Sequence, residues 1–403
     1  MNDRAHPRAA QVIELVALSV AALALTLNRG FYEQLTNNVF FSLTLAACAA
    51  IFLSLRRLKE FPQAVGVGIG LSALQWVVLK VPAKVLPVVA LIGFASWLLL
   101  AARRILFLPA RQLNDRQLKE RQLLQDAIVP PFLFLLLGYF GSGPLELTGR
   151  LHPKTFDRFL YSFDQSLGVQ MSFAFGRMAW RSRLLLRGLL AFYYLLPIAI
   201  LTAYARQLVR DRNLAMTAFL AFALAGPLGV VFYNLLPACG PEYLFGAKFP
   251  FEPLTVIQFG QLPLETVAIA GVRNAFPSLH LAWALLIFWY SKGMSRVAQL
   301  AFFVFVVGTA CATLGLGEHY FVDLVVAFPY ALLVYAICAL HVSIFDRRRA
   351  IPIAAGLILL LAWVALLRWG GWTVVPSPVV PWLLVAATVG LSLFLQARLR
   401  AIP

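Results

Sequence analysis

Residues 273–283 read RNAFPSLHLAW, and residues 317–325 read GEHYFVDLV. Both stretches stand at the edges of apolar runs, in a chain that has only five histidines and 17 acidic residues. They place His280, His319 and Asp323 where a span would enter a membrane. Placing an ionisable side chain near a membrane interior costs free energy, and such side chains are usually paired or functional. These three residues are therefore candidates for a functional site.

The composition of the whole chain indicates a polytopic membrane protein. Of its 403 residues, 61% are hydrophobic and only 13% are charged, and the mean hydropathy is +0.81. These values lie far from those of soluble domains. The formal net charge is +17, but the basic residues form short clusters between apolar runs. Such clusters are typical of topology signals and lipid headgroup contacts, and they do not indicate nucleic-acid binding.

Apolar windows of about twenty residues predict an all-α protein with about twelve transmembrane helices. The predicted spans are residues 11–28, 37–55, 64–82, 86–102, 127–141, 184–205, 214–236, 278–291, 297–315, 319–343, 352–370 and 379–396. With the N-terminus in the cytoplasm, most of the basic clusters fall on the cytoplasmic side, as the positive-inside rule requires. We therefore expect both termini in the cytoplasm.

Two segments outside the spans have distinctive compositions. Residues 103–126 are the most polar stretch and predict a cytoplasmic helix that follows four N-terminal spans. Residues 150–187 mix aromatic and aliphatic side chains with arginine and lysine, as short helices in the headgroup plane do. This second segment is either an ordinary interfacial loop or a platform that holds an anionic lipid beside the site.

His319 and Asp323 are spaced by four residues at the start of a predicted span. Residues at i and i+4 share a helix face, so Asp323 is expected to accept a hydrogen bond from one His319 ring nitrogen. The other ring nitrogen would then be an oriented base or nucleophile. The alternative is a carboxylate buried for structure, but an unpaired charge inside a span costs several kcal/mol.

The residues before His280 predict an anion site. Arg273 lies close to a Pro-Ser helix start, where free backbone N–H groups and the helix dipole favour a phosphate-like group. Ser278 would either donate its hydroxyl to that group or cap the helix. Together these groups would stabilise the charge of a phosphoryl group during its transfer.

The two motifs FPSLH and HYFVD resemble those of the type 2 phosphatidic acid phosphatase superfamily. The resemblance is closest to its inositol phosphorylceramide synthase-like (inositolphosphotransferase) branch. It implies a six-helix catalytic core over residues 127–345. Residues 1–126 would add four transmembrane helices and the cytoplasmic linker helix, and residues 346–403 would add two more transmembrane helices.

The resemblance also implies a role for each motif residue. His319 corresponds to the nucleophile that attacks phosphorus, and Asp323 corresponds to its partner. His280 corresponds to the residue that protonates the leaving oxygen and then activates the accepting water or alcohol. A phosphohistidine intermediate divides one difficult displacement into two steps and requires neither a metal nor a cofactor.

The sequence departs from the phosphatase branch in its fixed cations. The first-motif region, residues 233–253, lacks the usual Lys followed by Arg-Pro. Leu279 replaces a glycine before the middle histidine, and Thr313 stands where an arginine is usual. Arg273 and Lys248 are the nearby basic residues that we expect to hold the phosphate instead. For Lys248 the alternative is a side chain that only reaches the interface.

Two acidic residues lie close to the motifs. Glu318 directly precedes His319, where a carboxylate would repel a phosphate dianion if it pointed into the site. It would instead bind a hydroxylated headgroup, or face water at the helix start, where acidic residues are favoured. The same alternatives apply to Glu242.

We therefore expect an integral membrane phosphotransferase, in a bacterial inner membrane, with its active site on the extracytoplasmic face. It would move a phospho-headgroup of the inositol-phosphate type from a membrane phospholipid to a lipid or alcohol acceptor. One alternative is a lipid phosphate phosphatase that acts on phosphatidic acid or a polyprenyl phosphate or diphosphate. Another is a non-enzymatic lipid transporter that reuses the fold. The sequence specifies neither the donor and acceptor nor the oligomeric state.

Overall fold

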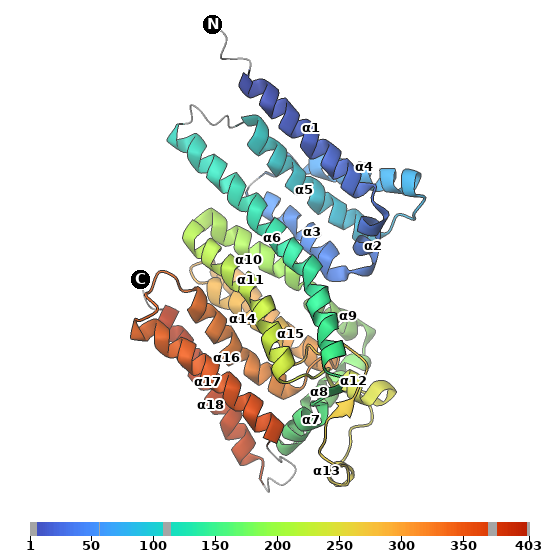
Figure 1. The fold of residues 1–403 in the computed structure, drawn as a ribbon, viewed down its shortest axis with the longest axis vertical. Coiled ribbons are helices and arrows are strands. Elements are labelled where there is room, and N and C mark those ends of the chain that lie inside the picture. The colour runs from blue at the N-terminus through green and yellow to red at the C-terminus, as the bar shows by residue number, and fades with distance from the viewer. Residues whose placement is uncertain (1–5, 56, 108–113, 370–376, 401–403) are drawn as a thin grey trace. The chain divides into compact units, whose positions relative to one another are not determined.

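The computed structural model describes residues 6–55, 57–107, 114–369 and 377–400. Almost all of this chain is helical (Figure 1). Within the described ranges, the strands are β1 (Lys154–Thr155) and β2 (Val267–Ala268), which pair antiparallel with Lys154 opposite Ala268. The predicted all-α architecture is confirmed.

Nine helices of the described chain are long and apolar enough to cross a membrane. They are α1 (His6–Thr26), α4 (Phe61–Leu79), α5 (Val85–Phe107), α6 (Asp115–Leu151), α11 (Arg212–Leu235), α15 (Arg296–Gly315), α16 (Phe321–Cys338), α17 (Arg347–Trp369) and α18 (Val379–Arg400). Two bent pairs raise the number to 11 if each pair is one span. These pairs are α2 (Arg29–Asn37) with α3 (Val39–Ser54), and α9 (Arg183–Tyr194) with α10 (Leu196–Arg210). The chain is an integral membrane protein.

Two predicted segments differ from the structure. The span expected at 278–291 is α14 (Leu279–Tyr290), whose 12 residues rise about 18 Å, less than a bilayer core of about 30 Å. The polar segment at 103–126 is not a separate helix, because α6 runs unbroken from Asp115 through the following apolar run. Glutamine, arginine, lysine and glutamate are good helix formers, so the change in polarity does not end the helix. Residues 108–113 of this segment lie outside the described residues, as do Arg4 and Arg56 of the basic clusters.

The chain forms two compact units, which are described separately. The first comprises Met1–Tyr139 and Pro197–Met216, and the second comprises Phe140–Leu196 and Thr217–Pro403. These units are defined by packing alone. The boundaries predicted at residues 126 and 345 separate the catalytic core from the added helices, and this functional division stays a prediction.

Small residues bring the helices of the first unit together. At Gly93 in α5, a Cβ atom would lie 2.0 Å from the carbonyl oxygen of Leu45 in α3. At Gly68 in α4, it would lie 2.6 Å from the Cα of Ile92. Glycines at such positions allow backbones to approach closely, which is a common way to stabilise helix pairs in a membrane.

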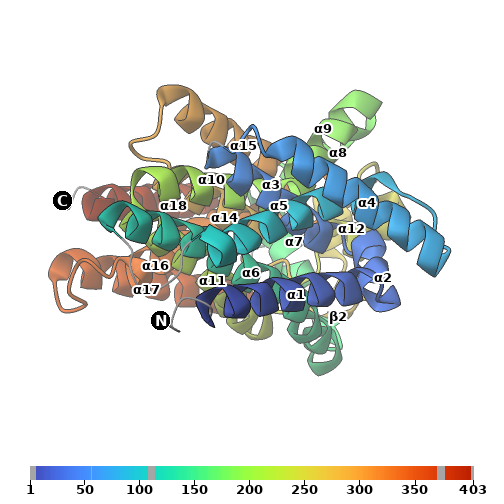
Figure 2. The same ribbon diagram turned by 90° about the horizontal axis from the view of Figure 1, so that it is seen from above.

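Helix α16 is the centre of the second unit. Its apolar stretch is 83% buried, and the helix packs against α14, α17 and α18. Figures 1 and 2 both show α16 and α17 side by side. Shorter elements precede the motif helices in the chain: α7 (Asp157–Ser166), α8 (Met171–Trp180), α12 (Pro241–Phe245), η1 (Gly246–Lys248) and α13 (Val256–Gly260). The short helices predicted within residues 150–187 are present as α7 and α8, and their place in the headgroup plane stays a prediction.

The contact at Gly93 gives a test of the packing in the first unit. Gly93→Ala should lower the free energy of unfolding by about 1–3 kcal/mol, because the new methyl group overlaps the α3 backbone. The matched control is Gly66→Ala in α4, where a Cβ atom meets nothing within 4 Å. Thermal unfolding of the detergent-purified variants measures the difference, and equal midpoints for the two variants would contradict this packing.

Candidate active site

The two histidine motifs meet within the second unit. His280 lies in the first turn of α14, and His319 lies just before α16. Their ring centroids are 6.3 Å apart, with an edge-to-face arrangement. Two imidazoles at this separation allow a group that is bonded to one ring to exchange a proton with the other, which is the arrangement that acid–base chemistry requires.

A backbone carbonyl fixes the tautomer of His319. The Nδ1 atom of His319 lies 2.8 Å from the carbonyl oxygen of Ala275. A carbonyl oxygen can only accept a hydrogen bond, so in the neutral ring the proton is on Nδ1 and the lone pair is on Nε2. Nε2 is therefore the nitrogen of this histidine whose lone pair can act as a base or a nucleophile.

The hydrogen bond expected between His319 and Asp323 is not formed. The Nδ1 atom of His319 is 3.5 Å from Asp323 Oδ2, which is longer than an N–H···O bond. Asp323 Oδ2 accepts instead from the backbone N–H of Tyr320, at 2.7 Å. The physical reason is that α16 begins only at Phe321, so the i, i+4 geometry of a helix does not include His319. Asp323 supports the start of the helix, and an electrostatic role beside His319 stays a prediction.

Burial keeps His319 neutral. Its side chain is almost fully buried, and this burial lowers its pKa from 6.5 to about 4. The neighbouring carboxylate of Glu318 and the Ala275 carbonyl act in the opposite direction but do not outweigh the burial. The imidazole is thus in its nucleophilic form at neutral pH.

Asp164 of α7 holds the start of α16. This fully buried carboxylate accepts the backbone N–H groups of Phe321, at 2.7 Å, and Val322, at 3.1 Å. Burial raises the pKa of Asp164 to about 8, against the lowering effect of these two hydrogen bonds. Nearby, the hydroxyl of Ser172 in α8 donates to the His319 carbonyl at 2.9 Å. The helix-start donors of α16 are therefore satisfied by the protein itself.

Asp157 ties a second loop to Tyr320, the residue after His319. Its carboxylate accepts the N–H groups of Cys239 and Gly240 and the hydroxyl of Tyr320, which lies 3.0 Å away. Gly240 has a φ of 117°, and a Cβ atom there would lie 2.5 Å from the Glu318 carbonyl oxygen. Only glycine allows this loop to pack so closely against residues 317–320.

Ser278 caps α14 and connects the two motifs. It is fully buried, and its side chain accepts from the N–H of Leu281 at 3.4 Å. Its own N–H donates to the carbonyl of Asp323 at 3.2 Å. The capping alternative is confirmed, while donation by the hydroxyl to a phosphate stays a prediction.

Arg273 forms hydrogen bonds with the backbone of neighbouring loops in this structure. Its buried guanidinium donates to the carbonyls of His152, at 2.9 Å, Pro153, at 3.3 Å, and Gly271. A further contact reaches the sulfur of Cys239 at 3.6 Å. Since a guanidinium has five N–H groups, most of its donors are already used. Phosphate binding by Arg273 therefore stays a prediction, and the geometry of the structure does not support it.

Lys248, the other predicted cation, is exposed at the end of η1. An exposed lysine on a short loop agrees with the alternative of a side chain that reaches the interface. Its role as a phosphate ligand also stays a prediction.

Tyr193 of α9 is a residue of the site that sequence analysis missed. Its ring stacks on His280 with centroids 4.1 Å apart and an interplanar angle of 19°. No local signal distinguishes it, because Tyr193 lies among other aromatic residues of an amphipathic helix. Asp157 and Asp164 were also missed, although two acids in a basic interfacial segment are a usable signal.

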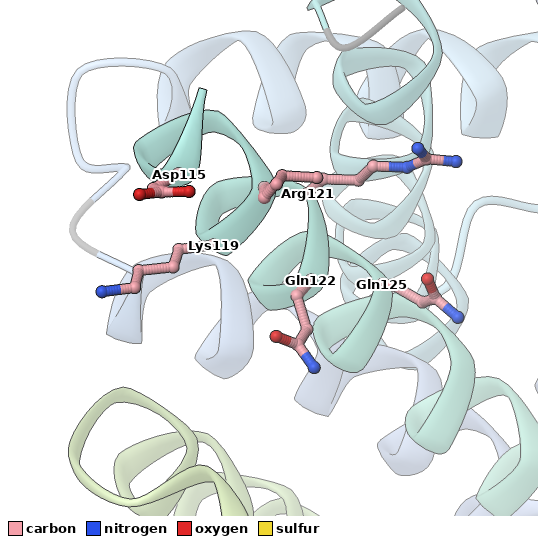
Figure 3. Close-up of a pocket in the computed structure, with 6 residues that line it drawn as sticks. Asp115, Lys119, Arg121, Gln122 and Gln125 are labelled. Carbon is pink, nitrogen blue, oxygen red and sulfur yellow. The ribbon is translucent and has the colours of Figure 1, made fainter. Parts of the chain in front are cut away.

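A separate hollow lies in the first unit, beside the start of α6 (Figure 3). Its volume is about 480 Å³, and the side chains that line it all belong to this one helix: Asp115, Leu118, Lys119, Arg121, Gln122 and Gln125. A wall from a single helix does not enclose a small molecule, in contrast with the histidine pair, which several segments surround.

Comparison with known protein families agrees with this geometry. Residues 158–337 match the family described as the PAP2 superfamily, and this range contains both histidine motifs. The match supports the predicted superfamily for this part of the chain, and it supports phosphoryl transfer, because members are phosphatases or phosphotransferases. No curated protein and no solved structure matches the chain.

The low pKa of His319 can be measured by NMR of protein labelled with ¹³C in its histidine rings. Because burial lowers this pKa, the His319 ring should stay neutral and show no protonation shift between pH 7.5 and 5.5. Its resonance is identified as the one missing from His319→Gln. A midpoint near 6.5 would show that the ring is not desolvated as the structure describes.

Proposed function

We propose that the PAP2 superfamily segment of this membrane protein is the catalytic part of a lipid phosphotransferase. It would move a phospho-headgroup of the inositol-phosphate type from a phospholipid to a lipid or alcohol acceptor through a phosphohistidine intermediate. One observation carries the proposal. His319 has its proton fixed on Nδ1 by the Ala275 carbonyl, which leaves Nε2 as a nucleophile beside His280.

In the first step, Nε2 of His319 attacks the phosphorus atom of the donor. A P–N bond forms, and the P–O bond to the lipid alcohol breaks. Burial lowers the pKa of His280 to about 3, so its ring must take up a proton for this step. It gives that proton to the leaving oxygen, so that the alcohol departs neutral. The Ala275 carbonyl accepts the hydrogen bond of Nδ1–H throughout, and it stabilises the positive charge that develops on the ring.

In the second step, neutral His280 removes the proton from the acceptor hydroxyl. The acceptor oxygen attacks phosphorus, a new P–O bond forms, and the P–N bond to His319 breaks. His319 returns to its neutral form, and His280 is again protonated for the next cycle. Water in place of the alcohol would use the same groups, so the acceptor pocket decides between transfer and hydrolysis.

The proposed topology follows from the distribution of basic residues. The basic clusters at residues 291–296 and 346–349 follow the C-terminal ends of α14 and α16, and the two motifs stand at the N-terminal ends of these helices. The positive-inside rule places such clusters in the cytoplasm, which puts the histidines on the extracytoplasmic face and both termini in the cytoplasm. Lipid donors and acceptors would then reach the site from the outer leaflet.

Product identification tests the proposed reaction. Purified protein is incubated with labelled phospholipids and lipid phosphates, with and without ceramide, diacylglycerol and polyol acceptors. His319→Ala should lower the rate by at least about a thousandfold, since it removes the nucleophile. The matched control is His341→Ala, at an exposed histidine outside the site, which should keep the wild-type rate.

Each outcome of this assay has a definite meaning. A product that carries the phospho-headgroup on the added acceptor supports transfer. Release of inorganic phosphate or of the free phospho-headgroup, without any added acceptor, indicates a phosphatase or other hydrolase. Full function in His319→Ala would overturn the enzymatic proposal and favour a lipid transporter that reuses the fold.

A further inference from the structure

Helices α8 and α9 pack against each other where two of the long apolar helices end. At Gly315, the last residue of α15, a Cβ atom would lie 2.9 Å from the Leu189 side chain of α9 and 3.5 Å from the Phe175 carbonyl oxygen of α8. Ser172 of α8 donates to the carbonyl of His319, just before α16 begins. These contacts predict that α8 and α9 lie at the level of the lipid headgroups.

Each of these helices has one face toward the histidine pair and another face directed outward. In α8, Ser172 is buried, whereas Arg177, five residues later and about 140° further around the helix, is exposed. In α9, Tyr193 is buried and stacks on His280. Arg187, six residues before Tyr193 and about 120° away around the helix, is exposed. The arginines therefore lie on the outer side of two helices that contact the site.

The outer side carries four arginines that lack a protein partner. They are Arg177, Arg181, Arg183 and Arg187, and all four are exposed. None of their guanidinium groups forms an ion pair or a hydrogen bond with the residues that the structure describes. Arg158 of α7, in contrast, donates to the Pro263 carbonyl at 3.0 Å and to the Glu265 carboxylate at 3.4 Å. The chain has no acidic residue between Asp164 and Asp211, so this segment does not neutralise its own positive charge.

Large apolar side chains alternate with these arginines. Trp180 is 56% exposed, and Leu184 is 82% exposed. The Trp180 ring also contacts the exposed ring of Phe251, with the centroids 6.3 Å apart. Glu252 follows Phe251 and is exposed, and it forms no ion pair with the described arginines. Arginine together with tryptophan and leucine is typical of helices that lie in the headgroup region of a bilayer.

We infer that the outer side of α8 and α9, here called the arginine surface, binds the headgroups of anionic lipids. Its members are Arg177, Trp180, Arg181, Arg183, Leu184 and Arg187. A guanidinium can donate two parallel hydrogen bonds to a lipid phosphate, and the apolar side chains would contact the acyl chains. A zwitterionic lipid carries its own cation beside the phosphate, so four uncompensated arginines favour an anionic headgroup.

The lipid on the arginine surface is a second lipid, distinct from any substrate of the histidine pair. The arginines face away from Ser172 and Tyr193, through which α8 and α9 contact the two histidines. A lipid bound there would hold these helices in place without entering the site. The inference concerns binding alone, so it does not depend on the proposed reaction.

Quenching of Trp180 fluorescence tests the inference. The full-length protein is reconstituted in phosphatidylcholine bilayers that contain phosphatidylglycerol, and one of the two lipids carries bromine atoms on its acyl chains. The Trp180 signal is the difference between wild type and Trp180→Phe. Its quenching gives the relative binding constant of phosphatidylglycerol over phosphatidylcholine. This constant should be at least about ten, because each basic residue near an anionic lipid surface contributes about fivefold.

Paired substitutions remove the charges of one helix at a time. Arg177→Gln with Arg181→Gln, and separately Arg183→Gln with Arg187→Gln, should each lower the relative binding constant at least about fivefold. The two pairs are independent, so misfolding of one variant leaves the other as a test. Arg177→Lys with Arg181→Lys keeps the charge and should keep the preference for phosphatidylglycerol.

The matched control removes two exposed charges elsewhere. Arg347→Gln with Arg348→Gln, at the start of α17, should leave the relative binding constant at Trp180 unchanged.

Three results would overturn the inference. They are a wild-type protein without preference for phosphatidylglycerol, two glutamine pairs that both keep the wild-type preference, and loss of the preference when inorganic phosphate is added. The last result would mean that the surface binds a free anion rather than a lipid. Failure of the proposed function is a separate result, because it consists of equal turnover in wild type and His319→Ala.

Discussion

The hydrogen bond from His319 Nδ1 to the carbonyl of Ala275 is the interaction on which the site depends. It joins the loop before α14 to the loop before α16, and it decides which nitrogen of His319 carries the lone pair. The bond requires both loops to hold their positions to within a few tenths of an ångström. Much of the surrounding polar structure serves that requirement.

Buried aspartates hold these loops in place. Asp164 accepts two N–H groups at the start of α16, and Asp157 joins residues 239 and 240 to Tyr320. Buried polar groups of this kind stabilise a structure only when their partners are present, so they fix one arrangement of the loops. The consequence is a neutral, oriented histidine beside Asp323, while the guanidinium of Arg273 is bonded to backbone carbonyls.

The sequence alone predicted the class of the protein and that His280 and His319 lie together, while their catalytic roles stay predictions. The apolar runs predicted an all-α membrane protein, and the two short motifs predicted the superfamily that residues 158–337 match. The hydrogen bonds of the site could not be predicted in the same way. Asp323 was expected to orient His319 from a spacing that holds only within a helix, and the helix begins after that histidine. Ala275, Tyr193 and Asp157 act through contacts between distant segments, which no local pattern specifies.

The phosphohistidine is the central claim, and mapping it is the most direct test. The protein is mixed with a donor lipid labelled at its phosphorus atom, quenched in alkali within one turnover, and digested for mass spectrometry. We predict a phosphoryl or phosphodiester adduct that is stable in alkali and labile in acid, on the peptide that contains His319. Turnover without any adduct at His319, or an adduct on another residue, would contradict it.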